Sequence, residues 1–273
     1  MSASRIDETT LEVHGHAVVV RRLRIERARE ARSLPLVLVH GAGGNHLAFD
    51  FLLAALASYE IDVLVPAFPG HAASRGDALS TVAALSAWLD ATCEVLGLER
   101  VIVAGHSLGG AVAIDLACSD APAAKSRLAG LGLIATGARL RVAPIILDAV
   151  RLAIATRAPL DLSRFEYGPD VAHEIVAREE IARRLTAPEA ALADWLAADA
   201  FDRMQDLARI DVPTSVVAGA DDALTPLKYA RYLADRIRGA DLVVVPGAGH
   251  MLQVERPRET AAALAGLVAR ARP

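Results

Sequence analysis

Apolar residues along this chain gather in short runs that alternate with longer stretches in which they recur every three or four positions. The short runs in the first half of the chain are residues 34–40, 61–68, 100–105 and 128–137. Runs of this length, bounded by glycine, proline or polar residues, are typical of strands buried on both faces of a parallel sheet. The stretches between them predict helices over residues 47–59, 79–98 and 108–120, the second beginning after an N-cap at Ser80 and ending at Gly97.

The two ends of the chain extend this pattern. Residues 9–15 and 16–26 flank Gly15 and predict an antiparallel hairpin. Near the other end, the sequence predicts a strand over 212–220, a helix over 224–238, a strand over 240–250 and a last helix from Pro257 onward. Alternation of strand and helix favours an α/β fold in which helices cover both faces of one parallel sheet.

The alternation stops between residues 138 and 206. This stretch is rich in Ala, Leu, Arg and Asp, contains no convincing strand, and is interrupted by Pro144, Pro159, Pro169 and Pro188. We therefore expect residues 138–206 to form several amphipathic helices, inserted as a lid after the sixth strand. Residues 1–137 and 207–273 would together form one core domain.

Composition narrows the classes of function. The chain has 273 residues, 53% of them hydrophobic, and a net charge of −4, which favours a large core and gives no basic surface for nucleic acid. No apolar run reaches the ~20 residues of a membrane span, and the first residues do not resemble a secretory signal. Cys93 and Cys118 lack metal-ligand spacing and are expected to be buried thiols. We expect a cytoplasmic protein with no membrane span and no nucleic-acid partner.

Ser107 stands in a Gly-x-Ser-x-Gly pattern, directly after one predicted strand and directly before a predicted helix. Gly105 and Gly109 would let strand and helix approach closely around a strained serine, and His106 would pack beneath the turn. The hydroxyl would then point up at the start of a helix, as a nucleophile requires. A serine that only caps the helix would share these local features.

Two further loops supply the partners that a serine nucleophile needs. His250 follows the last predicted strand in a Gly-Ala-Gly-His turn, where it could act as a base. Asp222 follows another strand and could orient that base, although Asp221 competes for the role. The order Ser107, Asp222, His250 is the one found in α/β-hydrolases, and each residue lies at the carboxyl end of a predicted strand.

A fourth signal is the glycine-rich turn in residues 37–49, "VLVHGAGGNHLAF". Backbone N–H groups there and after the nucleophile could stabilise an oxyanion. The expected donors are Ala42 and Leu108, with Gly43 as the fallback for the first, and His40 is expected to brace the turn.

These motifs resemble the α/β-hydrolase-fold serine hydrolases, in the small carboxylesterase-like branch with a helical lid after strand six. The matching stretches are "LVHGAGGN", "VPAFPGHAAS", "VIVAGHSLGGAVA", "VPTSVVAGADDALTP" and "VVVPGAGHMLQVERP". The resemblance implies a mostly parallel eight-stranded sheet. It also favours Asp222 over Asp221, because the acid in this family usually stands three residues after a strand-terminal glycine, here Gly219.

One stretch departs from the family pattern: "GHAAS" has Ala72 where glycine is common, which puts the conformation of that loop in doubt. His71 and Ser74 are expected to form hydrogen bonds that stabilise the loop.

The resemblance implies hydrolysis of carboxylic esters through an acyl-enzyme on Ser107. We expect no metal, because the eight histidines are dispersed and no His-x-x-x-His or Cys-x-x-Cys pair appears, and we expect no cofactor. An apolar lid favours small to medium apolar substrates. The same triad serves thioesterases, lactonases, carbon–carbon bond hydrolases, perhydrolases and amidases. From other classes, a ligand sensor or a cofactor-free oxygenase with this fold stays open. The oligomeric state is left open as well.

Overall fold

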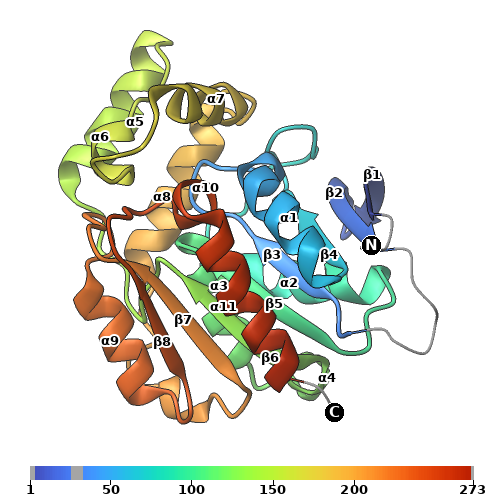
Figure 1. Ribbon diagram of the computed structural model, residues 1–273. Coiled ribbons are helices and arrows are strands. Elements are labelled where there is room, and N and C mark those ends of the chain that lie inside the picture. The colour runs from blue at the N-terminus through green and yellow to red at the C-terminus, as the bar shows by residue number, and fades with distance from the viewer. Residues whose placement is uncertain (1–3, 26–32, 272–273) are drawn as a thin grey trace.

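The computed structural model describes residues 4–25 and 33–271, which form one eight-stranded sheet with helices on both faces (Figure 1). The strands are β1 (Ser4–Val13), β2 (His16–Ile25), β3 (Leu36–Val39), β4 (Val63–Pro66), β5 (Val101–His106), β6 (Leu128–Ile134), β7 (Thr214–Gly219) and β8 (Asp241–Val245). Their order across the sheet is β1-β2-β4-β3-β5-β6-β7-β8. Strand β2 runs antiparallel to β1 and β4, and the other neighbours are parallel. The predicted fold class is confirmed.

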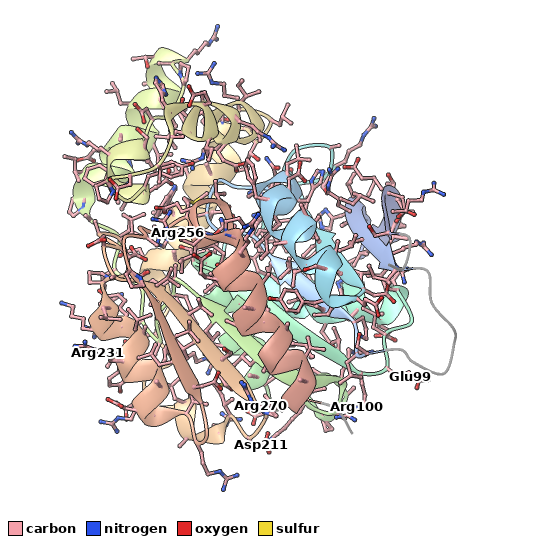
Figure 2. The ribbon with its side chains drawn as sticks, in the orientation of Figure 1. Glu99, Arg100, Asp211, Arg231, Arg256 and Arg270 are labelled. Atoms are coloured by element: carbon pink, nitrogen blue, oxygen red, sulfur yellow. The ribbon has the colours of Figure 1, made fainter. Side chains whose placement is uncertain are left out.

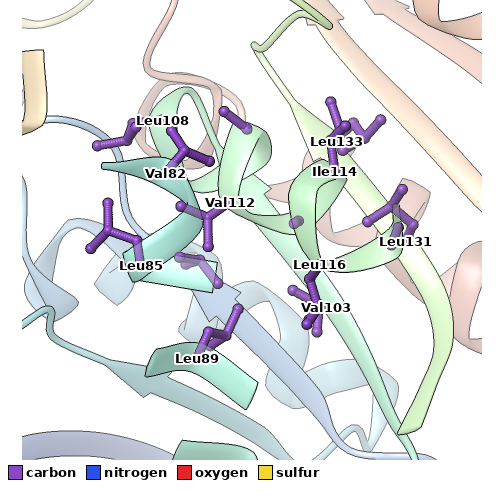
Figure 3. Close-up of a cluster of buried hydrophobic side chains, with 14 of the residues drawn as sticks. Val82, Leu85, Leu89, Val103, Leu108, Val112, Ile114, Leu116, Leu131 and Leu133 are labelled. Atoms are coloured by element: carbon purple, nitrogen blue, oxygen red, sulfur yellow. The ribbon is translucent and has the colours of Figure 1, made fainter. Parts of the chain in front are cut away.

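Alternate residues of the central strands enter two separate cores, one on each face of the sheet. Leu36 and Leu38 of β3 lie in the core beneath α1 (Asp50–Leu56) and α11 (Pro257–Arg270). Val37 and Val39 lie in the other core, beneath α2 (Val82–Val95), α3 (Leu108–Ala117) and α9 (Leu227–Arg236). Figure 3 shows the second core, with side chains of α2, α3, β5 and β6 in one cluster. Burial on both faces explains why these strands are apolar throughout.

Several boundaries differ from those predicted. Strand β1 begins at Ser4 rather than residue 9, because its acidic side chains pair with arginines across β2, as in the Glu8–Arg21 bridge. Residue 26, expected at the end of the second strand, lies outside the described residues. Helix α2 is capped by Thr81, whose Oγ1 accepts a hydrogen bond from the Ala84 N–H, and not by Ser80.

The remaining elements are short or lie between β6 and β7. The predicted helix over 47–59 is three pieces, η2 (His46–Phe49), α1 and η3 (Ala57–Tyr59). The other short elements are α4 (Pro122–Arg127), η4 (Leu207–Arg209) and α10 (Leu252–Glu255). Within residues 4–25 and 33–271, no helix is long and apolar enough to cross a membrane.

Residues 138–206, which we call the helical insertion, contain four helices that gather at one end of the sheet in Figure 1. They are α5 (Pro144–Thr156), α6 (Ser163–Glu166), α7 (His173–Arg183) and α8 (Pro188–Ala200). Arg139 and Asp202, at the two ends of the insertion, form an isolated β-bridge. Figure 2 labels Arg100, Asp211 and Arg270 at the opposite end of the sheet, far from the insertion.

Candidate active site

Ser107 occupies a sharp turn between β5 and α3, with φ 54° and ψ −117°, a conformation that non-glycine residues rarely adopt. Strand and helix approach so closely here that a Cβ on Gly105 would collide with the Gly109 backbone. A Cβ on Gly109 would collide with the backbone of Val39. Both positions therefore require glycine, because the neighbouring backbone leaves no room for a side chain. Ser107 lies at the top of the turn and is 8% exposed.

Asp222 and His250 lie together beside this turn. The Nδ1 atom of His250 is 2.9 Å from Oδ2 of Asp222. Asp222 also accepts hydrogen bonds from the backbone N–H groups of Leu224 and Thr225 and from the Thr225 hydroxyl, which fix its carboxylate. Asp221, the competing acid, is exposed, and only Asp222 contacts the histidine.

The electrostatics of this pair favour a negative aspartate beside a basic imidazole. Burial opposes ionisation of Asp222, but His250 and the hydrogen bonds to the carboxylate hold its pKa below the ordinary value. Burial likewise lowers the pKa of His250, but the Asp222 carboxylate outweighs it, and the pKa lies above the ordinary 6.5. Neutral His250 carries its proton on Nδ1, facing Asp222, which leaves Nε2 free to accept one.

The loop that carries His250 is tied down from several sides. The Glu255 carboxylate accepts a hydrogen bond from the Met251 N–H at 3.0 Å. Arg256, labelled in Figure 2, donates to the carbonyl of Gly247 at 2.8 Å. The N–H of His250 itself donates at 2.7 Å to a carbonyl of the helical insertion, that of residue 166. The Gly-Ala-Gly-His turn is thus ordered by neighbours in both the core and the insertion.

His106, inside the elbow motif, packs under His250. Its Nε2 is 2.9 Å from the His250 carbonyl, so Nε2 carries the proton and donates it. Burial lowers the pKa of His106 to about 3, and the ring is neutral. Its Nδ1 side lies against Gly41, where a Cβ would approach to 2.8 Å. His106 therefore connects the elbow, the His250 loop and the glycine-rich turn.

The glycine-rich turn after β3 is held by His40. The Phe68 N–H donates to Nε2 of His40 at 3.1 Å, so the ring proton is on Nδ1 and donates to the Gly41 carbonyl at 3.0 Å. The N–H of Gly44 donates to the same carbonyl at 3.1 Å. Because the Gly41 carbonyl is fixed, so is the peptide plane that contains the N–H of Ala42.

The next N–H along the turn, that of Gly43, is engaged by the helical insertion. It donates to Oδ2 of Asp194, on α8, at 2.9 Å. Gly43 has φ 66°, and a Cβ there would lie 3.1 Å from the Cβ of Ala191 on the same helix. Helix α8 therefore presses directly on the turn, and the fallback oxyanion donor of the sequence prediction already has an acceptor.

Asp194 also binds His71, a contact between core and insertion that sequence reasoning missed. Both ring nitrogens of His71 face acceptors: Nδ1 faces the Pro69 carbonyl at 3.0 Å and Nε2 faces Asp194 at 2.9 Å. Both nitrogens must then donate, so His71 is an imidazolium. Burial opposes this charge, yet Asp194 and the carbonyl raise the pKa of His71 above its ordinary value. Both side chains of this ion pair are 0% exposed.

The loop of His71 has a left-handed backbone at the position that departs from the family pattern. Ala72 has φ 48°, in the left-handed region that glycine adopts without strain. An alanine there costs roughly 1 kcal/mol. Ser74 accepts from the Val19 N–H and donates to the Ala67 carbonyl, and it joins the loop to two strands as the sequence suggested.

Two cavities meet at Ser107 and His250, and Trp195 of α8 lines both. The larger, about 240 Å³, has the expected apolar wall, formed chiefly by Leu140, Val142, Ile146, Leu224 and Tyr229. The smaller, about 30 Å³, is lined by polar side chains that the sequence did not predict near the serine: Asn45, Glu166, Glu179, Arg183 and Gln253. Within residues 4–25 and 33–271, no three His, Cys, Asp or Glu side chains cluster to hold a metal ion.

A mostly parallel sheet with a serine on a sharp strand-to-helix turn, followed in sequence by an aspartate and a histidine that meet beside it, is typical of α/β hydrolases. Residues 36–263 match the alpha/beta hydrolase family, and the chain belongs to that family.

Individual relatives point to esters. The chain is 31% identical over 251 residues to a pimeloyl-[acyl-carrier protein] methyl ester esterase of Neisseria meningitidis serogroup B / serotype 15 (strain H44/76), covering 83% of this chain and 91% of that protein. A solved structure of a thermophilic esterase has a TM-score of 0.80 at 26% identity, covering 98% of this chain and 99% of the other. The family and these relatives support an ester-hydrolysing enzyme.

Another relative is a dihydrolipoyllysine-residue acetyltransferase component of an acetoin cleaving system from Pseudomonas putida. It is 33% identical over 236 residues, which cover 81% of this chain. This chain spans only 60% of that relative's length.

The buried His71–Asp194 pair predicts a pH-dependent stability. Folding raises the pKa of His71. The stability that protonated His71 contributes is therefore complete below about pH 6.5, its pKa in the unfolded chain. This stability is lost as the pH rises through the higher pKa of the folded protein. His71→Gln should lower the free energy of unfolding by about 3 kcal/mol at pH 6, and by progressively less toward pH 9.5. Urea unfolding at several pH values measures this difference.

His173→Gln, which changes an exposed histidine of α7, is the matched control and should alter stability little at any pH. A difference between wild type and His71→Gln that stays constant with pH would contradict the imidazolium assignment.

Proposed function

We propose that this protein hydrolyses carboxylic esters through an acyl-enzyme on Ser107, with His250 as general base and Asp222 as the acid that orients it. The observation that carries the proposal is the meeting of the His250–Asp222 pair with the strained Ser107 elbow at the same two cavities. A serine hydroxyl needs both a base and an orienting acid to attack a carbonyl. The esterase relatives support the same bond type.

The proposed reaction has two halves. His250 Nε2 takes the Ser107 proton as Oγ bonds to the ester carbonyl carbon, and the protonated His250 then donates that proton to the leaving alcohol. In the second half, His250 takes a proton from water, whose oxygen bonds to the acyl carbon, and Ser107 Oγ leaves with the proton that His250 returns. Asp222 stabilises the imidazolium that forms in each half. The residues of the described chain form no hydrogen bond to the Ser107 hydroxyl, and such bonds often tighten only with substrate.

The oxyanion of each tetrahedral intermediate would be bound by the N–H groups of Ala42 and Leu108. Leu108 is the first residue of α3, where N–H groups have no partner within the helix. Ala42 is preferred to Gly43, because the Gly43 N–H donates to Asp194. Gly105, His106 and Gly109 would support the elbow through the contacts described above.

We also propose that the helical insertion, residues 138–206, acts as the lid of the site. It contributes Glu166, Arg183 and Trp195 to the cavity walls around Ser107. The core residues 1–137 and 207–273 would supply the chemistry. The larger cavity, with its largely apolar wall, suits an apolar arm of the substrate.

The first test is covalent labelling. A fluorophosphonate should add one label to Ser107, and a short p-nitrophenyl ester should give a burst of p-nitrophenol followed by steady turnover. Ser107→Ala should abolish both signals, because no other hydroxyl occupies the elbow. Loss of activity in His250→Ala, with most activity kept in Ser107→Ala, would instead favour oxygenase-type base chemistry. A single turnover with a ligand-dependent rise in melting temperature would favour a sensor.

The second prediction concerns the pH profile. Only neutral His250 can accept the serine proton, so kcat/KM should fall as the pH drops through a pKa above the ordinary 6.5. Asp222→Asn removes the charge that raises this pKa, so the acid limb should move to lower pH. The plateau of kcat should also drop by about 10³–10⁴-fold.

Asp221→Asn is the matched control, since it makes the same change one residue away on an exposed side chain. Initial rates between pH 4.5 and 9 measure both variants, and equal profiles for the two would overturn the assignment of the acid.

The third prediction concerns Asp194. Asp194→Asn removes the negative charge that the Gly43 N–H and the His71 imidazolium share, and it weakens both hydrogen bonds. Movement of Gly43 then displaces the adjacent Ala42, whose own N–H is held only through the Gly41 carbonyl, and the proposed donor loses alignment. Asp194→Asn should therefore lower kcat by about 10–100-fold, part of the cost of losing an oxyanion donor outright, while KM changes much less. Asp202→Asn, on the exposed surface of the same insertion, is the control. A rise in KM at unchanged kcat would mean that Asp194 only docks the insertion.

A further inference from the structure

The small cavity beside Ser107 contains a carboxyl group that the proposed reaction does not use. Glu179, on α7 of the helical insertion, is 4% exposed and lines the cavity together with Ser107 and His250. In the described part of the chain its carboxyl group has no hydrogen-bond partner. A buried carboxyl without a partner is costly to a fold, so its retention beside a nucleophile points to a ligand.

The two arginines nearest in sequence are engaged elsewhere. Arg183 forms a bidentate pair with Glu166, at 3.0 and 2.7 Å. Arg178 binds Asp50 at 3.1 Å. Burial raises the pKa of Glu179 to about 7, despite the attraction of both arginines. Around neutral pH its carboxyl group can therefore either accept or donate a hydrogen bond.

Two other polar groups on the same cavity wall also lack partners. The Oε1 atom of Gln253, a residue 0% exposed, has none, and its Nε2 reaches only the sulfur of Met251 at 3.8 Å. The indole N–H of Trp195 has none either. Three residues of the cavity wall thus carry polar atoms that no group of the described chain satisfies, which is the pattern expected of a binding subsite rather than a packed interior.

The charges around the cavity select a neutral occupant. Glu166 and Arg183 neutralise each other, and burial raises the pKa of Glu179 to about 7, so an ionised group would gain little net attraction here against the cost of its burial. A hydroxyl group both donates and accepts, so it can donate to Glu179 or Gln253 and accept from Trp195 without adding a buried charge. Size is the second limit. The cavity of about 30 Å³ has room for roughly two water-sized groups, which suits a hydroxymethyl group.

We propose that the small cavity is a subsite for a short hydroxyl-bearing arm of the substrate, which donates a hydrogen bond to the Glu179 carboxyl group. The preferred substrates are then esters with a hydroxymethyl group on one side of the ester and an apolar arm, seated in the larger cavity, on the other. The proposal rests on the ester hydrolysis proposed above, and it replaces an apolar substrate with one that is polar at one end.

Two isosteric pairs of esters test it and distinguish the two sides of the ester. Butyl glycolate and butyl propionate differ by hydroxyl against methyl on the acyl side, and 2-hydroxyethyl butyrate and propyl butyrate differ in the same way on the alcohol side. Acid release in a pH-stat gives kcat/KM for each. The same esters compete with fluorophosphonate labelling of Ser107, which ranks their binding even where turnover is slow.

For each pair, the quantity to compare is kcat/KM for the hydroxyl ester divided by kcat/KM for the methyl ester. Dividing this ratio in wild type by the same ratio in a variant cancels the intrinsic reactivity of the two esters. Glu179→Met should lower the ratio by about tenfold for one of the two pairs. Glu179→Gln, which keeps hydrogen-bonding atoms, should keep most of it. Glu174→Met makes the same change as the first variant at an exposed position of the same helix, and should leave the ratio unchanged.

Glu179→Met should also melt at the same temperature as wild type or higher, because it removes an unpaired buried carboxyl group. If this variant fails to fold, Gln253→Met is measured against Gln205→Met, which changes an exposed glutamine. The hydroxyl-to-methyl ratio of kcat/KM should be lower in Gln253→Met than in wild type, and it should be unchanged in Gln205→Met.

Failure of the subsite is distinct from failure of the proposed function. The subsite is overturned, while Ser107 is still labelled, if wild type prefers the hydroxyl ester in neither pair. It is also overturned if Glu179→Met changes kcat/KM equally for both esters of each pair. Absence of labelling would overturn the ester hydrolase itself.

Discussion

The contact between β5 and α3 at the Ser107 elbow constrains everything else in the site. Strand and helix backbones touch there, so that neither Gly105 nor Gly109 has room for a Cβ. Because the turn is tight, Ser107 is held in a strained conformation, which fixes the position of its hydroxyl group. The His250 loop and the glycine-rich turn then have to be brought to that place, and His106 contacts both of them from within the elbow.

A second constraint links the helical insertion to the core. Oδ2 of Asp194 accepts from the Gly43 N–H and from the His71 imidazolium, so one buried carboxylate oxygen joins α8 to two separate loops. A buried charge is stable only when it is paired and hydrogen-bonded. Removal of either partner would leave the other as an uncompensated buried charge, which destabilises the fold. Docking of the insertion on the core and the conformation of the glycine-rich turn are therefore coupled through Asp194. The neutral state of His40, whose pKa is lowered by burial and by the nearby His71 charge, belongs to the same network.

The sequence was most informative where structure is determined locally. Short apolar runs identified the central strands, and the ends of those strands located Ser107, Asp222 and His250. Local patterns were least informative where a long-range contact decides the outcome. The first residues of β1 are polar and are stabilised by ion pairs across the strand, so periodicity missed them. His71 and Asp194 are 123 positions apart and meet only because α8 docks on the turn. No pattern in a polar helix such as α7 indicates that Glu179 is its buried residue.

Apart from the first residues of β1, these failures of prediction have a common physical origin, because the missed groups are polar side chains that become buried where the insertion meets the core. Local propensity and hydrophobic patterning place apolar residues inside, and they give no reason to bury Glu179 or Asp194. Asp194 is compensated by His71, a partner from the core. Glu179 is not compensated, and α7 would pack better with an apolar residue in its place. The proposed ligand would resolve this conflict between fold and residue by completing the hydrogen bonds of the carboxyl group. In the proposed function, the core would therefore determine which bond is broken, whereas the insertion would determine which substrate presents that bond to Ser107.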